Sequence, residues 1–457
     1  MVVVVFYPHF SYAENLRKVM AKAYNNSGLL EQNRALLRAA DEDVAVAVSA
    51  LRGVLSWSSS VEQNKAQSLS TNSSFGRQEI DTLSTVANVG LTASITLYDG
   101  GQNRFALAAA KEAVLATRQR LVSVEQQVLL ATVRAFMEVR RERKNVALRK
   151  NNLRVIGEEL KAAKDRFEVG EVTKTDVALA SARLAASGSA LAAAKGGLLQ
   201  AEEIFRQTVG DRAKSLFVHT KRPQLPSSSL VVKKAAVQNH PEIIAVKHDI
   251  KQAEFNMKRV RGIFRPSVRL STSLGYTEQE YDDFRRSGTI SLSASAPIYS
   301  GGRTPALLRK ATAHLDVQRS ELHLTRLKLE QEAGSAFALL QMAKAGRKAS
   351  EEQIRASKLA FEGIREEAKV GARTTLDVLN AEQELLDAQA DLNSAEADEL
   401  IATYRVLAQM GELTVDKLNL PVIKYNPLEY YNLVRTAPTS LSKRGQQLDK
   451  ILQTFSK

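Results

Sequence analysis

The sequence predicts a membrane α+β protein, with four membrane-spanning β-strands and long antiparallel coiled-coil helices per chain, arranged as two tandem repeats. Three observations predict this fold class. Two short motifs recur at one common spacing, and apolar residues alternate with small polar ones in segments of about ten residues. In addition, two helical stretches of about 65 residues carry apolar heptads. These patterns favour an extended, duplicated chain over several compact domains.

Two motifs define the repeat. The segment 169–177 returns as 370–378, 201 residues later, with its Val, Gly, Thr, Asp and Val in place. The segment 98–101 returns as 299–302 at the same spacing, and we expect both copies to form strand-to-helix bends. One offset shared by two unrelated motifs indicates a duplicated half-chain. The predicted bend residues are Tyr98, Gly100, Gly101, Tyr299, Gly301 and Gly302.

Each copy of the first motif predicts a tight turn between two helices. Gly170 and Gly371 suit the left-handed conformation in which helices commonly end. Thr173 or Thr175 can cap the helix that follows the first turn, and Asp176 suits the positive end of its dipole. The result is a helical hairpin with little bulk at its tip. The turn residues of the two tips are Val169, Gly170, Val370 and Gly371.

Composition excludes several classes of function. The chain has no Cys, so it has no disulfide, thiolate metal site or cysteine nucleophile. Its net charge of +14 is spread along helices between Glu residues, and no basic block contains aromatic residues, so no nucleic-acid partner is expected. The 6 His lack ligand spacing, and no Ser–His–acid arrangement or phosphate loop is present. We therefore predict no enzyme activity, cofactor or metal site.

Residues 1–13 are predicted to be a truncated signal segment. A short apolar run is followed by small residues at Ser11 and Ala13, although no basic residue precedes the run. No stretch reaches the roughly 20 apolar residues of a membrane helix. Any membrane crossing is therefore expected to be by strands.

Four strands are predicted, at 54–64 and 85–98 in the first repeat and at 266–276 and 288–299 in the second. Apolar residues mark one face and Gly, Ser and Thr the other, which suits a lipid-facing surface and a water-filled lumen; a soluble sandwich is the alternative. Four strands cannot close a barrel, and an open edge is costly in lipid. Several chains would share one barrel, of eight strands in a dimer or twelve in a trimer.

The long helices are predicted at 102–168 and 303–369. In both, the heptad contains one four-residue step at the same point, which locally unwinds a supercoil, and Arg347 interrupts the second heptad. Shorter helices are expected at 14–26, 29–53, 176–207, 242–262 and 377–409. The predicted organisation is a signal segment 1–13, first repeat 14–212, connector 213–235, second repeat 236–413, and a C-terminal segment 414–457 with a loose tail.

The two Tyr-x-Gly-Gly sites, the two tip motifs and the sequence Asn-His-Pro-Glu at 239–242 resemble the outer-membrane efflux proteins, the TolC-like exit ducts of Gram-negative export machines. The resemblance covers nearly all of 14–411, although the first half reads Asn-Ser-Gly at 26–28 instead of Asn-Pro-Glu. The stretch 37–44 looks most like members that serve type I protein secretion.

This resemblance implies a homotrimer with a twelve-stranded barrel in outer-membrane lipid and a helical periplasmic tunnel. The tips would close the tunnel until a periplasmic adaptor and an inner-membrane ABC or proton-driven pump engage, and the tip turns would dock the adaptor. By the same resemblance, Thr175 and Asp176 match acceptors of the closing links and Arg373 the donor. Asp377 matches one of two acidic rings, while Asn380 takes the place of the second acid. The family's tip tyrosine falls on Ala368, so the resemblance implies a weakened gate.

Two other classes of function remain as alternatives. A periplasmic adaptor also uses long helical hairpins, but the two strand pairs and the complete duplication count against it. A soluble coiled-coil scaffold is the other. A wall of Ser, Thr, Ala and scattered charge selects little, so the sequence does not identify a transported substrate.

Overall fold

The computed structural model describes residues 14–72, 76–217, 223–279 and 283–455, so the predicted signal segment 1–13 lies outside the described residues. The chain forms two compact units. The first, here called the helical unit, comprises residues up to 35, 118–245 and 322–425. The second, the sheet unit, comprises 36–117, 246–321 and 426–457.

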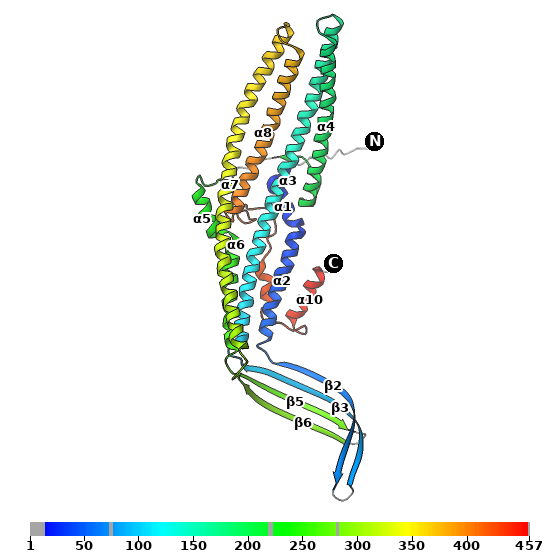
Figure 1. The fold of residues 1–457 in the computed structure, drawn as a ribbon, viewed down its shortest axis with the longest axis vertical. Coiled ribbons are helices and arrows are strands. Elements are labelled where there is room, and N and C mark those ends of the chain that lie inside the picture. The colour runs from blue at the N-terminus through cyan, green and yellow to red at the C-terminus, as the bar shows by residue number, and fades with distance from the viewer. Residues whose placement is uncertain (1–13, 73–75, 218–222, 280–282, 456–457) are drawn as a thin grey trace, which may run out of the picture. The chain divides into compact units, whose positions relative to one another are not determined.

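Four helices build the two hairpins. The helices α3 (Gln102–Glu168) and α7 (Arg303–Lys369) have 67 residues each and coincide with the predicted ranges. They turn back into α4 (Lys174–Val209) and α8 (Thr375–Gln409), so that α3–α4 is the first hairpin and α7–α8 the second (Figure 1). Both return helices begin two residues before the predicted start, because a threonine just ahead of each helix caps it.

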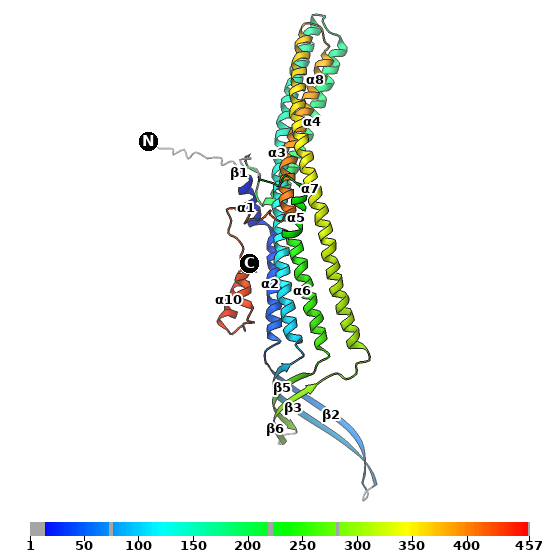
Figure 2. The same ribbon diagram turned by 90° about the vertical axis from the view of Figure 1, so that its left-hand side faces the viewer.

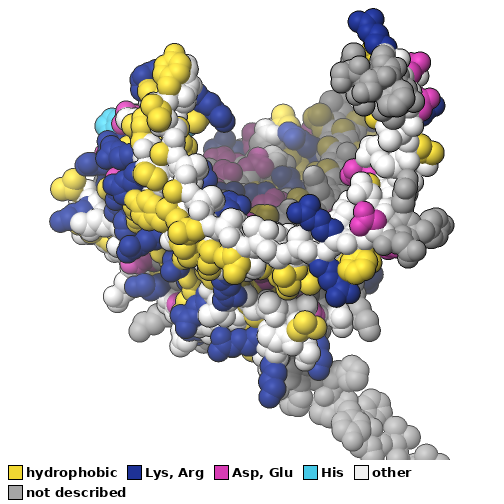
Figure 3. All heavy atoms as spheres, turned by 90° about the horizontal axis from the view of Figure 1, so that it is seen from below, with side chains coloured by type: hydrophobic (Ala, Val, Ile, Leu, Met, Phe, Trp, Pro, Cys, Tyr) yellow, Lys and Arg dark blue, Asp and Glu magenta, His cyan; other side chains and the backbone are white. Residues whose placement is uncertain are grey.

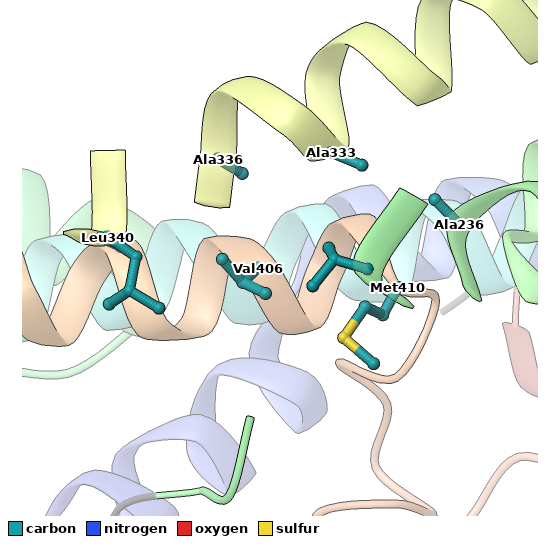
Figure 4. Packing of buried hydrophobic residues seen from close by; sticks show 8 residues of the cluster. Ala236, Ala333, Ala336, Leu340, Val406 and Met410 are labelled. Atoms are coloured by element: carbon teal, nitrogen blue, oxygen red, sulfur yellow. The ribbon is translucent and has the colours of Figure 1, made fainter. Parts of the chain in front are cut away.

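Small residues let a further helix approach the second hairpin. In the helical unit, α5 (Ser229–Asn239) presents Ala236 to a buried cluster with Ala333 of α7 and Met410, the residue that follows α8 (Figure 4). Alanines allow the helix axes to lie close together. The end of the connector predicted at 213–235 lies within α5, which starts at Ser229 and packs as a helix.

One helix corrects the expectation that no apolar stretch has the length of a membrane span. Among the described helices, α4 is long and apolar enough by length and composition, and its many alanines contribute to this. One face of α4 packs within the helical unit, where Ala180 contacts a buried cluster that includes Ile156 of α3 and Leu379 of α8.

The sheet unit contains a four-stranded antiparallel sheet in the order β2-β3-β5-β6. Its strands are β2 (Val54–Asn72), β3 (Gly76–Tyr98), β5 (Ser267–Gln279) and β6 (Asp283–Ser295). The predicted strand ends need correction: β2 ends at 72 instead of 64, β3 begins at 76 instead of 85, β5 ends at 279 instead of 276, and β6 spans 283–295 instead of 288–299. β2 and β3 continue as a paired hairpin through the polar segment, because backbone hydrogen bonding needs no apolar alternation. β6 stops before Pro297, which has no N–H to donate.

The predicted two faces of the sheet are confirmed. Leu91 of β3 lies opposite Trp57 of β2 and Leu274 of β5, and these side chains are about half exposed or more. On the other face, the hydroxyls of Ser271 and Ser291 lie 2.7 Å apart. In the space-filling view from below, hydrophobic side chains gather in a curved band (Figure 3). One face is therefore apolar and the other hydroxylated.

The remaining elements complete the two units. In the helical unit, α1 (Leu16–Asn26) follows β1 (Glu14–Asn15), which pairs in parallel with β4 (Leu216–Phe217). The helices α2 (Gly28–Ser49) and α6 (Pro241–Gly262) lie near their predicted ranges. The predicted loose tail is wrong, because its residues form the helix α10 (Lys443–Phe455), which follows α9 (Pro427–Val434) (Figure 2). Leu448 of α10 packs into a buried cluster with Ala45 of α2.

A buried histidine caps the start of α6. The Nδ1 atom of His240 accepts a hydrogen bond from the backbone N–H of Glu242 at 3.3 Å, and the residue is 7% exposed. Burial lowers the pKa of His240 from its usual value of 6.5. Protonation would remove the acceptor and place a positive charge at the positive end of the helix dipole.

We expect acidic pH to destabilise the junction between α5 and α6, where His240 lies. A histidine whose pKa is lower in the folded than in the unfolded chain contributes stability that is present above 6.5 and lost as the pH falls towards the folded value. The variant His240→Asn keeps a capping oxygen that does not titrate, and should lose less thermal stability between pH 7.5 and pH 5.5. The exposed His314 supplies the control His314→Asn. Equal losses in wild type and His240→Asn would contradict this assignment.

Candidate functional site

The two tips are shaped by glycines and carry exposed apolar side chains. Gly170 and Gly371 have φ of 79° and 80°, in the left-handed region, as the motifs predict. The N–H of Gly170 donates to the carbonyl of Phe167 at 3.0 Å and thereby closes α3. Val169 and Val370 are 71% and 80% exposed. Each tip thus presents an apolar side chain that the described part of the chain leaves mostly exposed.

A capping box opens each return helix. The Thr173 hydroxyl accepts from the N–H of Asp176 at 3.3 Å, and a carboxylate oxygen of Asp176 accepts from the N–H of Thr173 at 2.9 Å. Thr374 and Asp377 repeat this arrangement at 3.2 and 3.0 Å. The cap of α4 is therefore Thr173, and Thr175 is left exposed.

The same contacts keep both tip carboxylates ionised. The hydroxyl and then the backbone N–H of Thr173 lower the pKa of Asp176. For Asp377, the backbone N–H of Thr374 is the larger cause and its hydroxyl the second, and the pKa is again lowered. The tips consequently carry a fixed negative charge at the start of α4 and another at the start of α8.

Arg373 has a partner that the sequence reasoning missed. Its Nε lies 2.8 Å from a carboxylate oxygen of Glu367, near the end of α7, and this contact raises the pKa of the arginine. Within a single chain Arg373 therefore pairs with an acid of its own hairpin. Both side chains are about half exposed, so Arg373 remains accessible to another acceptor.

Two further positions near the tips were assigned by resemblance. Arg183 of α4 donates to the side-chain oxygen of Asn380 at 3.0 Å, which links the two hairpins through α8. Ala368 is buried and lines a cavity of about 140 Å³ between α3, α7 and α8. Basic side chains, including Arg166 and Lys369, also line this cavity.

In the sheet unit, the Tyr-x-Gly-Gly sites form the expected bends into the long helices. Gly100 and Gly101 have φ of 68° and 87°, and a side chain at Gly100 would collide with the carbonyl oxygen of Gly262. The carboxylate of Asp99 accepts from the N–H of Gly101 at 2.9 Å and from that of Asn103 at 2.7 Å. Gly301 and Gly302 repeat the positive φ at 57° and 81°, next to Tyr299.

Two buried polar pairs in the helical unit were not predicted. Arg347 of α7 places its Nε 2.7 Å from a carboxylate oxygen of Glu399 on α8, whose side chain is 4% exposed. Asn152 of α3 donates to a carboxylate oxygen of Glu382 on α8 at 3.0 Å. The sequence signal for such a pair is a polar residue at a position of the helix where apolar residues are expected. Of the four residues in the two pairs, only Arg347 was identified in this way. Within the described chain, no group of three or more His, Asp or Glu is placed to hold a metal ion.

Comparison with known proteins matches these features to one family. The model of the outer membrane efflux protein family matches residues 19–211 and 232–412. The outer membrane efflux protein BepC of Brucella suis biovar 1 (strain 1330) is 35% identical over 426 residues, which cover 93% of this chain and 91% of BepC. The alkaline protease secretion protein AprF of Pseudomonas aeruginosa is 25% identical over 330 residues, or 68% of this chain and 66% of AprF.

A solved structure supports the same fold. The outer membrane channel CmeC of Campylobacter jejuni superposes with a TM-score of 0.77 at 18% identity, covering 93% of this chain and 90% of CmeC. At this identity the likeness concerns the fold alone. It includes both the strands and the long helical hairpins described above.

Proposed function

This chain belongs to the outer membrane efflux protein family, and we propose that three copies of it close into one gated duct that forms the exit of a tripartite export system. The protein is thus an outer-membrane efflux channel with a periplasmic helical domain, and not an enzyme. The trimer, the gate and the partners are the proposed parts.

The four-stranded sheet is the observation that carries the proposal. Its apolar face is exposed, its opposite face is hydroxylated, and β2 and β6 are its edges among the described strands. In lipid, unpaired edge groups are costly, so these edges need partners from other chains. Three copies supply twelve strands, and a barrel of that size leaves a pore, whereas eight strands are filled by side chains.

The tips support the proposed partners. Val169 and Val370 offer an apolar surface at the ends of the hairpins, where a periplasmic adaptor would dock and connect the duct to an inner-membrane pump. Type I protein secretion is favoured slightly, since the stretch 37–44 has the character of such members and AprF is named for alkaline protease secretion. Small-molecule export with a proton-driven pump is the second candidate, because BepC is named an efflux protein.

We expect the purified protein to run as a heat-sensitive trimer in detergent and to form ion-conducting pores in planar bilayers. Chemical cross-linking that stopped at dimers, or light scattering that gave a monomer, would overturn the shared barrel. Co-purification from the native envelope then separates the two export classes. An adaptor recovered together with an ABC exporter supports protein secretion, and one recovered with a proton-driven pump supports small-molecule efflux.

A further inference from the structure

We propose that Glu382 is a proton-responsive latch, which holds the second hairpin against α3 while its side chain is protonated and releases it when ionised. This inference rests on the proposed gated duct, because release of a hairpin would open the tips. It concerns a residue outside the capping boxes and outside the Arg373–Glu367 contact.

The geometry of Glu382 is unusual for a carboxylate. The residue is 6% exposed, and its Oε1 accepts from the amide of Asn152 on α3, which is itself 6% exposed. The second oxygen, Oε2, is buried and has no hydrogen-bond partner among the described residues. A buried, half-satisfied carboxylate is costly in its ionised form, whereas a protonated carboxyl group is tolerated far better.

Charged groups around Glu382 do not neutralise it. Burial is the main cause that raises its pKa to about 7, and Glu159 of α3 adds to the rise. The hydrogen bond from Asn152 and, more weakly, Arg365 of α7 and Arg154 of α3 lower the pKa, but they do not outweigh the effect of burial. On α4, the nearby Arg183 is directed to Asn380. Glu382 therefore titrates in the neutral range at the contact between two hairpins.

The internal repeat shows that the fold does not require this pair. With the 201-residue offset, Ser181 stands where Glu382 does and Gln353 where Asn152 does, and both are exposed. The equivalent residues of α7 and α4 thus form no buried carboxyl–amide pair. The Asn152–Glu382 pair connects the first hairpin to the second, and it lies one turn from Ile156 and Leu379 in the cluster that joins α3, α4 and α8. The latch consequently sits at the place where the two hairpins are packed together.

The latch predicts the size of the pH response. If Glu382 has its ordinary pKa of 4.5 in the released state and about 7 in the held state, the equilibrium shifts towards release by about tenfold per protomer between pH 6 and pH 8. Release should then increase as the pH rises. A bound adaptor would therefore need less binding free energy to open the tips at the higher pH.

The test compares single-channel conductance in planar bilayers at pH 6 and pH 8. Wild type should open more at pH 8, while Glu382→Gln, which keeps an acceptor for Asn152 but cannot ionise, should stay as closed at pH 8 as at pH 6. The exposed neighbour supplies the matched control Glu384→Gln, which should respond as wild type does. An unchanged pH response in Glu382→Gln, or no response in wild type, would overturn the latch.

Spin labels give a second reading that does not depend on pore formation. The chain has no native Cys, so labels can be placed at Glu171→Cys and Ala372→Cys, one on each exposed tip. The distance between the labels should lengthen from pH 6 to pH 8 in an otherwise wild-type background and stay constant with Glu382→Gln. If the protein forms no pores, the proposed duct fails, but these distances still decide the latch.

Discussion

Replacing Arg347 by valine should lower the thermal stability of the protein strongly, by about 3 kcal/mol in the free energy of unfolding. The reason is the carboxylate of Glu399, whose side chain is 4% exposed and lies 2.7 Å from the Arg347 Nε. Arg347 also pairs with Glu351 on its own helix. Without the arginine, the buried Glu399 on α8 would lose this cation, and removing one partner of a buried ion pair is strongly destabilising.

The repeat supplies the matched control for this prediction. With the 201-residue offset, Val146 and Leu198 stand where Arg347 and Glu399 do, so the first copy has an apolar pair at this place. The double variant Arg347→Val with Glu399→Leu copies that pair and should recover most of the lost stability, because apolar residues can replace a buried ion pair at little cost. Denaturation temperatures of the detergent-solubilised protein measure both variants. A double variant as unstable as the single one would show that the ion pair itself is required.

Much of the helical fold follows from local sequence, and the long-range pairs do not. The heptads and the Gly-Gly bends set both ends of α3 and α7, because caps and apolar periodicity act within a few residues. Arg347 was visible only as an interruption of its heptad. Its partner Glu399 lies on the next helix, and the register of α7 against α8 is needed to bring the two together. Glu382 and Asn152 escaped notice for the same reason.

The sheet shows a different limit of sequence reasoning. Alternation marks only the part of a strand that has one apolar and one polar face. The far half of the β2–β3 hairpin has only isolated apolar residues, and its pairing, such as Lys65 with Leu83, rests on backbone hydrogen bonds that any residue except proline can make. The described residues between the predicted strand ends at 64 and 85 therefore continue both strands. At the tips, the motif predicted the turns and the caps. It did not predict the contact between Arg373 and Glu367, because that contact depends on the conformations of two long side chains.

The gate should be the place where single substitutions change conductance most. We propose that in the trimer Arg373 links to Asp176 of a neighbouring protomer, in competition with the Glu367 that it contacts within its own chain. Three such links around one axis would act together on a single opening, so that a small change at each one adds up. The pKa of Asp176 is lowered by Thr173, which keeps its carboxylate charged and available.

Planar-bilayer conductance of three variants separates the proposed link from a role inside one chain. Arg373→Ser and Asp176→Asn should each raise the conductance several-fold, and their combination should add little, because both break the same link. Asn is chosen because its oxygen can still serve the capping box with Thr173, so that only the charge is lost.

Glu367→Gln should lower the conductance, since it frees Arg373 to bind the neighbouring protomer and tightens closure. Asp377→Asn should leave closure intact but weaken block by multivalent cations, as three carboxylates near the axis would form their site. If Glu367→Gln raised the conductance as Arg373→Ser does, Arg373 would act only within its own hairpin. The proposed link between protomers would then be wrong, and Arg373 would only stabilise the turn at its tip.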